Sequence, residues 1–372
     1  MLVIADDITG AAEMAGIAHC HGQQVRLLCS LCCDQVAAEK TGTTVIATDT
    51  RSMTEGEAVA ETRRLASHLS PLSSLLFKKT DSALRGHVVA ELKTLMEMTG
   101  YQRAFYLPAN PSKGRIIKDG TYYINGTPID QTDFSFDPEF PAKTAVLRER
   151  FPDAEANGIL MPDAETVEDI QKIVAAYDDG KTLFAGAADL FEATIGTIGT
   201  IGTIGTIGTI GTIGTIGTIG TIGTIDSTLF LCGSTQSKPL DLDIPVSPMP
   251  LAIYDGNQDI KEWLEETSAI YKREGSLMIS IPFRHRTGKE VAVHLREMTA
   301  TLIQGLIAQR QPQQLIIEGG ASAFTTLHRL GWNELEVVSQ LVPGVIKTKA
   351  PNGTFVIMKP GSYPWGNMFA NL

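Results

Sequence analysis

The sequence predicts an α/β protein of two domains, each a mainly parallel sheet flanked by helices. Its 372 residues are more than one compact core usually holds. Short apolar runs alternate with helix-like stretches, which is typical of βαβ units. A low-complexity block at 194–225 interrupts this alternation. We therefore expect an N-terminal domain at 1–193, a linker at 194–225 and a C-terminal domain at 226–372, with the active site in the interdomain cleft.

The N-terminal half carries the alternation most clearly. Apolar runs predict strands at 2–5, 25–31, 44–47, 74–78, 104–107 and 182–185. Helical periodicity predicts helices at 9–21, 55–68, 87–98 and 167–177. Asn125-Gly126 lies between two apolar runs and predicts a hairpin turn, a local addition to the α/β layer.

The same pattern resumes after the low-complexity block. Strands are predicted at 228–232, 251–254, 277–281, 314–317 and 355–358, and helices at 259–272 and 289–309. The block itself repeats Thr-Ile-Gly and contains no charge and no proline, so a collagen-like triple helix is excluded. A three-residue period offers no distinct inner and outer face, which favours a connector over a folded solenoid.

Composition limits the function classes. The chain is 43% hydrophobic and 20% charged, as in a globular protein with a real core. No apolar run approaches the roughly 20 residues that cross a bilayer, and no secretory signal opens the chain, so we expect a cytoplasmic protein. A net charge of -11 opposes binding to nucleic acid or anionic membranes. The five cysteines are expected to be mostly buried thiols, because the CxxC at Cys29 and Cys32 lacks a second pair.

Paired carboxylates end the first predicted strand, at Asp6 and Asp7, where a small-residue turn opens a helix. Ligands of open α/β sheets collect at the carboxyl ends of strands. One carboxylate could accept a hydroxyl proton or hold a substrate hydroxyl. Alternatively, Asp7 only caps the helix, although capping would explain just one of the pair.

A second strand end carries Lys78-Lys79-Thr80-Asp81 and continues to Arg85-Gly86. Two ammonium groups and a guanidinium could bind a carboxylate or phosphate there, the guanidinium with two parallel hydrogen bonds. Asp81 could instead neutralise these cations structurally. The loop at 110–115 adds Lys113 and Arg115 but is equally well explained as a charged surface loop.

Small residues end three predicted strands of the second half, at 233–234, 319–323 and 360–361. Glycine amides beside a helix N-terminus can approach a phosphate closely. Each turn alone is a weak signal, but the three together suggest a nucleotide pocket. Neither GxxxxGK[ST] nor GxGxxG occurs, which disfavours a P-loop or dinucleotide fold.

These motifs resemble those of the four-carbon acid sugar kinases. ADDITGA at 5–11 is similar to the family's ADDLTGA, and KKTDSALRG at 78–86 to its KKxDSTLRG. Further matches follow in order along nearly the whole chain, at 108–111, 114–115, 120, 126, 137–138, 233–234, 319–320 and 359–361. The resemblance implies an N-terminal domain that holds a tetronate-type sugar acid and a C-terminal domain that holds ATP.

On this resemblance the protein is an ATP-dependent kinase that phosphorylates the terminal hydroxyl of a four-carbon sugar acid, with Mg²⁺ accompanying the nucleotide. Asp7 is the candidate base or hydroxyl orienter and Asp6 the next; Lys79 and Arg85 would hold the substrate carboxylate or the transferring phosphoryl group. The other candidate substrate contacts are Lys78, Asp81 and Arg115, and the candidate ATP contacts are Ser234, Gly319, Gly320, Ala321, Ser322 and Gly361. No separate metal ligands are assigned, and a homo-oligomer is compatible with the sequence.

Two alternatives stay open. Ala321 and Ser322 replace the acidic residue and Thr that usually follow the family's Gly-Gly pair, so the chain could be a degenerate kinase that binds ligands with little turnover. A haloacid-dehalogenase-like phosphohydrolase also begins with a strand ending in Asp. In that class, however, one residue separates the two carboxylates, as in DxD, whereas Asp6 and Asp7 are adjacent.

Overall fold

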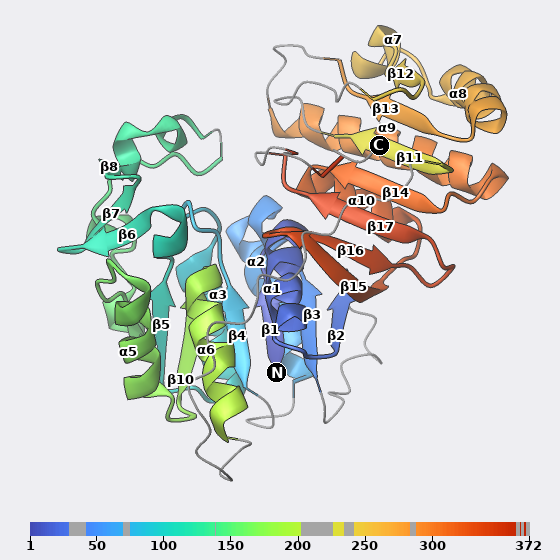
Figure 1. The fold of residues 1–372 in the computed structure, drawn as a ribbon. Coiled ribbons are helices and arrows are strands. Elements are labelled where there is room, and N and C mark those ends of the chain that lie inside the picture. Colours follow the sequence, from blue (N-terminus) through green and yellow to red (C-terminus); the bar gives the residue numbers. More distant parts are fainter. Residues whose placement is uncertain are drawn as a thin grey trace. The chain divides into compact units, whose positions relative to one another are not determined.

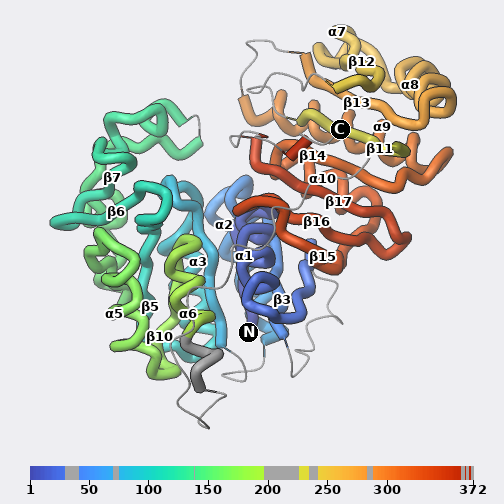
Figure 2. Tube along the Cα trace, in the orientation of Figure 1, coloured from blue at the N-terminus to red at the C-terminus, as the bar shows by residue number. Residues whose placement is uncertain are grey.

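A computed structural model describes residues 1–29, 42–69, 75–137, 139–201, 226–233, 242–282, 288–361, 365 and 368–369 of the chain. The chain divides into two compact units, the first made of Met1–Val25 and Leu31–Thr215 and the second of Arg26–Ser30 and Ile216–Leu372. Figures 1 and 2 show their elements along the chain. Each unit has a sheet flanked by helices, so the predicted α/β class is confirmed.

The first unit is built on parallel strands in the order β3-β1-β4-β10-β5-β9. They are β1 (Leu2–Ala5), β3 (Thr43–Ala47), β4 (Leu76–Lys79), β5 (Arg103–Leu107), β9 (Ile159–Leu160) and β10 (Thr182–Gly186). Its helices are α1 (Ile8–Cys20), α2 (Glu55–Ser67), α3 (Val88–Thr99), α4 (Leu147–Arg150), α5 (Val167–Tyr177) and α6 (Ala188–Ile201). Helices α1, α5 and α6 pack together, and α2 packs on α3 (Figure 1). Buried residues of β1 and β4 form the core between these helix layers.

A small antiparallel sheet is added after β5. It consists of β6 (Arg115–Lys118), β7 (Thr121–Ile124) and β8 (Thr127–Pro128). Asn125 and Gly126 both have positive φ, 50° and 80°, as the tight turn of a right-twisted hairpin requires, so the predicted hairpin is confirmed. Single 3-10 turns complete the unit: η1 (Thr50–Ser52), η2 (Pro111–Lys113), η3 (Ile129–Gln131), η4 (Asp133–Phe136) and η5 (Glu155–Asn157).

The second unit has a mixed sheet in the order β12-β13-β11-β14-β17-β16-β15, parallel from β12 to β17 and antiparallel beyond. Its strands are β11 (Thr228–Cys232), β12 (Val246–Pro248), β13 (Leu277–Ser280), β14 (Gln314–Glu318), β15 (Glu334–Val342), β16 (Val345–Lys349) and β17 (Phe355–Lys359). Its helices are α7 (Leu251–Tyr254), α8 (Lys261–Glu274), α9 (Lys289–Gln309) and α10 (Gly320–Arg329). β2 (Val25–Leu28) adds an antiparallel strand beside β15, where Arg26 Nε donates to Glu334 Oε1 at 2.7 Å.

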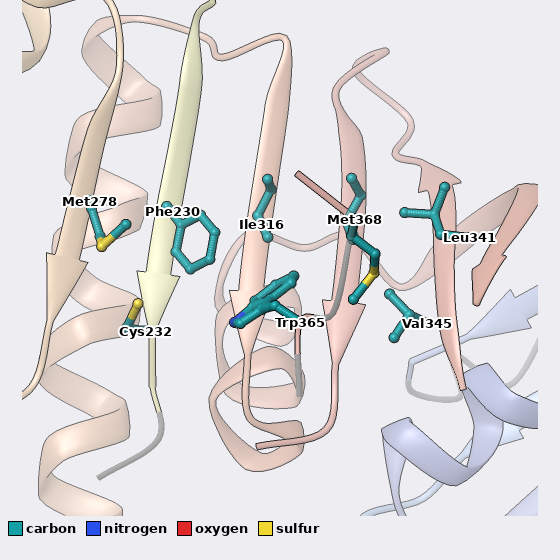
Figure 3. Close-up of a cluster of buried hydrophobic side chains, with 9 residues drawn as sticks. Phe230, Cys232, Met278, Ile316, Leu341, Val345, Trp365 and Met368 are labelled. Atoms are coloured by element: carbon teal, nitrogen blue, oxygen red, sulfur yellow. The ribbon is translucent and has the colours of Figure 1, made fainter. Parts of the chain in front are cut away.

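One face of this second sheet buries an apolar cluster. Phe230, Met278 and Ile316 point from three strands toward Trp365, whose ring lies 5.3 Å from that of Phe230 (Figure 3). Met368 joins the cluster from the same C-terminal segment. Trp365 and Met368 thus cover a face that the strands leave apolar.

Two predictions of secondary structure are wrong. Residues 251–254 form helix α7, because a four-residue apolar run does not by itself distinguish a strand from a helix. The repeat does not begin as a connector, since α6 continues through its first residues to Ile201. Thr194 and Ile195 are each 2% exposed there, so they belong to the core. Residues 202–225 of the predicted linker lie outside the described residues.

Candidate functional site

Charged side chains gather where the parallel strands of the first unit end. Ala5 of β1 pairs with Ala47 of β3 on one side and with Lys79 of β4 on the other, so the loops after these strands start at the same edge. We call the side chains there the strand-end cluster: Asp6, Asp7, Glu13, Arg51, Lys79, Asp81, Arg85, Lys113 and Arg115.

Arg51 is the hub of the carboxylates. Its Nε and Nη2 donate to the two oxygens of Asp6, both at 3.0 Å, and its Nη1 donates to Asp7 Oδ2 at 3.1 Å. Its Nη2 also lies 3.8 Å from Asp81 Oδ1. The three carboxylates therefore raise the pKa of Arg51 despite its burial, and the guanidinium stays charged.

Asp7 caps helix α1, as the structural alternative expected. Its Oδ1 accepts from the Gly10 amide at 2.8 Å and its Oδ2 from the Thr9 hydroxyl at 2.5 Å. Burial opposes its ionisation, but Arg51 and Lys79 outweigh burial and lower the pKa of Asp7. Asp6 differs, because burial, with the charge of Asp7, raises its pKa despite Arg51. Both side chains are thus committed to protein partners, and that of Asp7 remains 16% exposed.

Lys78 and Lys79 point to opposite faces of β4, as neighbours on a strand must. Lys79 faces α1, where its Nζ donates to the Thr80 carbonyl at 2.8 Å and lies 3.6 Å from Glu13 Oε2. Lys78 faces α3 and forms a fully buried ion pair with Glu91, 2.5 Å from Nζ to Oε2. The structure therefore brings Lys79 into the strand-end cluster and places Lys78 outside it.

Two more carboxylates hold the remaining cations in place. Glu13 of α1 also receives the ammonium of Lys113, and the two lysines lower its pKa although burial opposes them. Asp81 binds Arg85 at two points, 2.7 Å from Nε and 3.2 Å from Nη2. Arg51 and Arg85 hold the pKa of Asp81 far below its usual range, again against burial.

Arg115 is the exception among these cations. Its guanidinium donates to the Ser82 hydroxyl and lies 5.8 Å from the centre of the Phe134 ring, and in the described part of the chain it contacts no carboxylate. Arg85 lies 5.9 Å from the same ring. A half-buried guanidinium without a counter-ion can bind an anion without first breaking an ion pair.

The structure thus gathers Asp6, Asp7, Lys79, Asp81 and Arg85 at one sheet edge, with Arg115 beside Ser82. Sequence reasoning missed Arg51 and Glu13. Arg51 follows the end of β3, the strand next to β1, so strand order would have been needed to find it. Glu13 lies six residues beyond the cap of α1, on the face toward Lys79.

The second unit has its own strand-end feature. Glu318 and Lys359 are partners in the β14-β17 register and form a buried ion pair, 2.8 Å from Oε1 to Nζ. Gly319 caps α10, and Gly320 is its first residue. Ala321 is exposed, Gly361 is half-buried, and Ser322 is buried against Gly233. Ser234 lies outside the described residues.

The described chain offers no group of three or more His, Cys, Asp or Glu side chains that could hold a metal ion. Of the cysteines described, Cys29 and Cys232 are buried and Cys20 is exposed. Within the described residues, the helices include none with the length and apolarity that a membrane span needs. The chemistry available at the strand-end cluster is binding of anions and hydroxyl groups by fixed charges.

Parts of this sequence are similar to known proteins. A family profile described as a sugar-binding N-terminal domain matches residues 1–153. The D-threonate kinase of Salmonella typhimurium is 28% identical over 225 residues, which cover 52% of this chain and 52% of that protein. The 3-oxo-tetronate kinase of Brucella melitensis is 30% identical over 144 residues, 37% of this chain and 33% of the relative. The D-erythronate kinase of Heliobacterium modesticaldum is 29% identical over 152 residues, 40% and 34%. The chain spans about half the length of the first relative and about a third of the other two.

Solved structures resemble the whole chain. A Haemophilus influenzae protein of the DUF1537 family covers 100% of this chain and 98% of its own, with a TM-score of 0.71 and 19% identity. A Salmonella typhimurium protein covers 99% and 97%, with a TM-score of 0.74 and 16% identity. At such identities the likeness concerns the fold alone.

Proposed function

We propose that this protein is an ATP-dependent kinase that phosphorylates the terminal hydroxyl of a four-carbon sugar acid. The chain resembles the four-carbon acid sugar kinases, and its curated relatives confirm that resemblance. The observation that carries this proposal is Arg115, the cation of the strand-end cluster that contacts no carboxylate in the described chain. An acid substrate supplies that carboxylate. Residues 1–153, which include the whole cluster, are also those that match a sugar-binding domain.

Phosphoryl transfer needs positioning and charge neutralisation more than covalent chemistry from the protein. We assign the substrate carboxylate to Arg115, and the charge of the transferring phosphoryl group to Lys79. Asp7 orients the reacting hydroxyl. Its lowered pKa makes it a weak base, and a loose transition state needs little base strength.

The remaining residues hold these groups. Asp6 fixes Arg51, and Asp81 fixes Arg85, each through two hydrogen bonds. Because Arg85 is only partly exposed and already paired, it is a secondary contact for the phosphoryl group. Lys78 is assigned a structural role, since its ammonium is buried against Glu91.

ATP is assigned to the second unit, at the carboxyl ends of two neighbouring strands. One is β14, which ends just before Gly319, and the other is β17, which ends at Lys359. The carboxylates of the strand-end cluster are held by arginines and lysines, so they form no cage for Mg²⁺. The ion would arrive with the nucleotide phosphates and shield their charge.

The test is an assay of the purified protein with ATP and a panel of threonates, erythronates and 3-oxo-tetronates. We expect phosphorylated product from at least one acid. Arg115→Gln should raise the KM for that acid at least tenfold and leave the KM for ATP unchanged. Lys118→Gln, on the same strand but exposed and paired with Glu165, is the matched control.

Three results would contradict the proposal in different ways. Binding of both ligands without product would indicate the degenerate kinase. Phosphate release from a phosphorylated acid without ATP would indicate the hydrolase, in which Asp6 would first have to leave Arg51. An unchanged KM in Arg115→Gln would remove Arg115 from the carboxylate site.

A further inference from the structure

In the first unit, the proposed chemistry leaves the buried ion pair of Lys78 and Glu91 unused. Lys78 and Glu91 are 1% and 2% exposed, and their charged atoms lie 2.5 Å apart. Taking two charges out of water costs free energy that their attraction seldom exceeds, and apolar residues of similar volume often stabilise a fold as well or better. The pair is therefore better explained by what it holds in place than by stability.

Glu91 also binds the turn that carries Arg51. Its Oε2 accepts from the Thr50 hydroxyl at 3.0 Å. The Thr50 amide donates to Thr48 Oγ1 at 3.3 Å, and the Thr48 hydroxyl donates to the Ala5 carbonyl at 2.9 Å. These hydrogen bonds are all buried. They run without a break from β4 and α3 to the last residue of β1, directly before Asp6.

The turn needs such support. Asp49 has φ 55°, a left-handed conformation that is uncommon for a residue other than glycine. The 3-10 turn η1 that follows is only three residues long, and Arg51 is its middle residue. A small rotation of this turn would move the guanidinium away from the carboxylates, because the side chain is long and its hydrogen bonds are directional.

We propose that Lys78, Glu91 and Thr50 are positioning residues that aim Arg51 at Asp6 and Asp7. Lys78 orients Glu91, Glu91 holds Thr50, and Thr50 fixes the backbone from which Arg51 extends. In kinetic terms the inference rests on the proposed function, because misplacing Arg51 would disturb the carboxylate that orients the substrate hydroxyl.

The direct test is Thr50→Val, which has nearly the same shape and lacks the hydroxyl. We expect kcat/KM for the sugar acid to fall at least tenfold, mostly in kcat. Thr50→Ser restores the hydroxyl and should restore most of that loss. Thr94→Val is the matched control: Thr94 is buried on the same helix as Glu91, but its hydroxyl donates to the Ala90 carbonyl.

A second readout does not need turnover. Arg51 is the group that, with Lys79, lowers the pKa of Asp7 and, with Arg85, that of Asp81. A misplaced Arg51 should let these pKa values rise toward those of the unfolded chain. The loss of melting temperature between pH 7 and about pH 3.5, which spans the ordinary carboxyl pKa, should then be smaller in Thr50→Val than in wild type, Thr50→Ser or Thr94→Val.

Lys78→Met with Glu91→Leu removes the ion pair at similar volume and should still fold. Because the Thr50 hydroxyl then loses its bond to Glu91, this double variant should reproduce both effects of Thr50→Val. The inference is overturned if either folded variant keeps wild-type kcat/KM and a wild-type pH dependence of melting. If wild type turns over no acid, the proposed function fails, and the pH dependence of melting alone decides the inference.

Discussion

Asp6 and Arg51 form a two-point ion pair in which both contacts measure 3.0 Å and the Asp6 side chain is 3% exposed. The two residues come from neighbouring parallel strands, since Asp6 follows β1 and Arg51 follows β3. The pair therefore joins the loops that begin at this edge of the sheet. It also leaves Arg51 Nη1 directed at Asp7. Arg51, which was not predicted from the sequence as a site residue, therefore holds Asp7 in position.

Arg51→Lys tests this hub. A single ammonium group cannot reproduce the forked contact with Asp6 and also reach Asp7. We expect kcat to fall about 10²-fold and the free energy of unfolding to fall by about 3 kcal/mol, as when a buried charge loses its partner. Steady-state kinetics and denaturant unfolding measure the two effects. Arg63→Lys, at an exposed pair on α2, should change neither. Near-normal kinetics in Arg51→Lys would mean that Asp7 does not depend on Arg51.

Asp7→Asn separates capping from chemistry. The amide oxygen can still accept from Gly10, so α1 should keep its cap and the melting temperature should fall only slightly. Turnover should fall about 10²-fold, because the charge that orients the hydroxyl is gone. Thr54→Asn changes the cap of α2 without touching the cluster and serves as the control. If kcat of Asp7→Asn stays near wild type, capping is the whole role of Asp7.

Much of the fold could be predicted because the periodicity of apolar residues is visible within individual helices and strands. α5 and α9 have the predicted bounds, and the predicted strands at 44–47 and 104–107 match β3 and β5 to within one residue. The long β15-β16 hairpin was not predicted. β15 alternates buried and exposed residues irregularly because its pairing contains register shifts. Nothing local indicated that β2 would pair with β15, some 300 residues away.

The candidate site was predictable to the extent that strand ends reveal it. Asp6 and Asp7 follow β1 directly, Lys79 is the last residue of β4, and Asp81 comes two residues later, so position alone found them. Lys78 and Lys79 have different partners because neighbouring residues of a strand point to opposite faces. Which face meets α1 depends on tertiary packing, which the sequence alone does not show. Arg51 lies in the 3-10 turn after Asp49, whose backbone conformation is uncommon, and only the order of strands places Arg51 beside Asp6.

Three carboxylates of the strand-end cluster contribute to the pH dependence of stability. The pKa values of Asp7, Glu13 and Asp81 are lowered in the folded state, so each stabilises the fold above its unfolded pKa of about 4 and less as the pH falls through its folded value. Asp6, whose pKa is raised, opposes this trend alone. The melting temperature should therefore fall below about pH 4. Thermal unfolding of wild type and Asp81→Asn should show a shallower fall in the variant. Equal slopes would mean that Asp81 is not ionised through its arginines.

Gly10→Ala probes how closely α1 approaches the cluster. A Cβ at this position would lie 2.7 Å from Asp7 Oδ1 and 3.3 Å from Lys79 Nζ. The methyl group would displace the capping carboxylate, and we expect losses of melting temperature and of turnover. Gly56→Ala is the matched control on α2, where a Cβ meets nothing within 4 Å, and it should stabilise by up to about 1 kcal/mol. Equal melting temperatures for the two variants would show that the cap can move without cost.

The second unit also holds a buried ion pair. Lys359 and Glu318 are 0% and 1% exposed, and Lys359 Nζ lies 4.8 Å from the centre of the Trp365 ring. Lys359→Met leaves a buried carboxylate without its cation, which should cost about 3–5 kcal/mol of unfolding free energy. Adding Glu318→Gln removes that charge and should recover most of the loss, whereas the exposed Lys349→Met should have little effect. Denaturant unfolding of the three variants measures this. If the single variant is as stable as the double, Glu318 has taken up a proton in place of its partner, and the pair is not held together by charge.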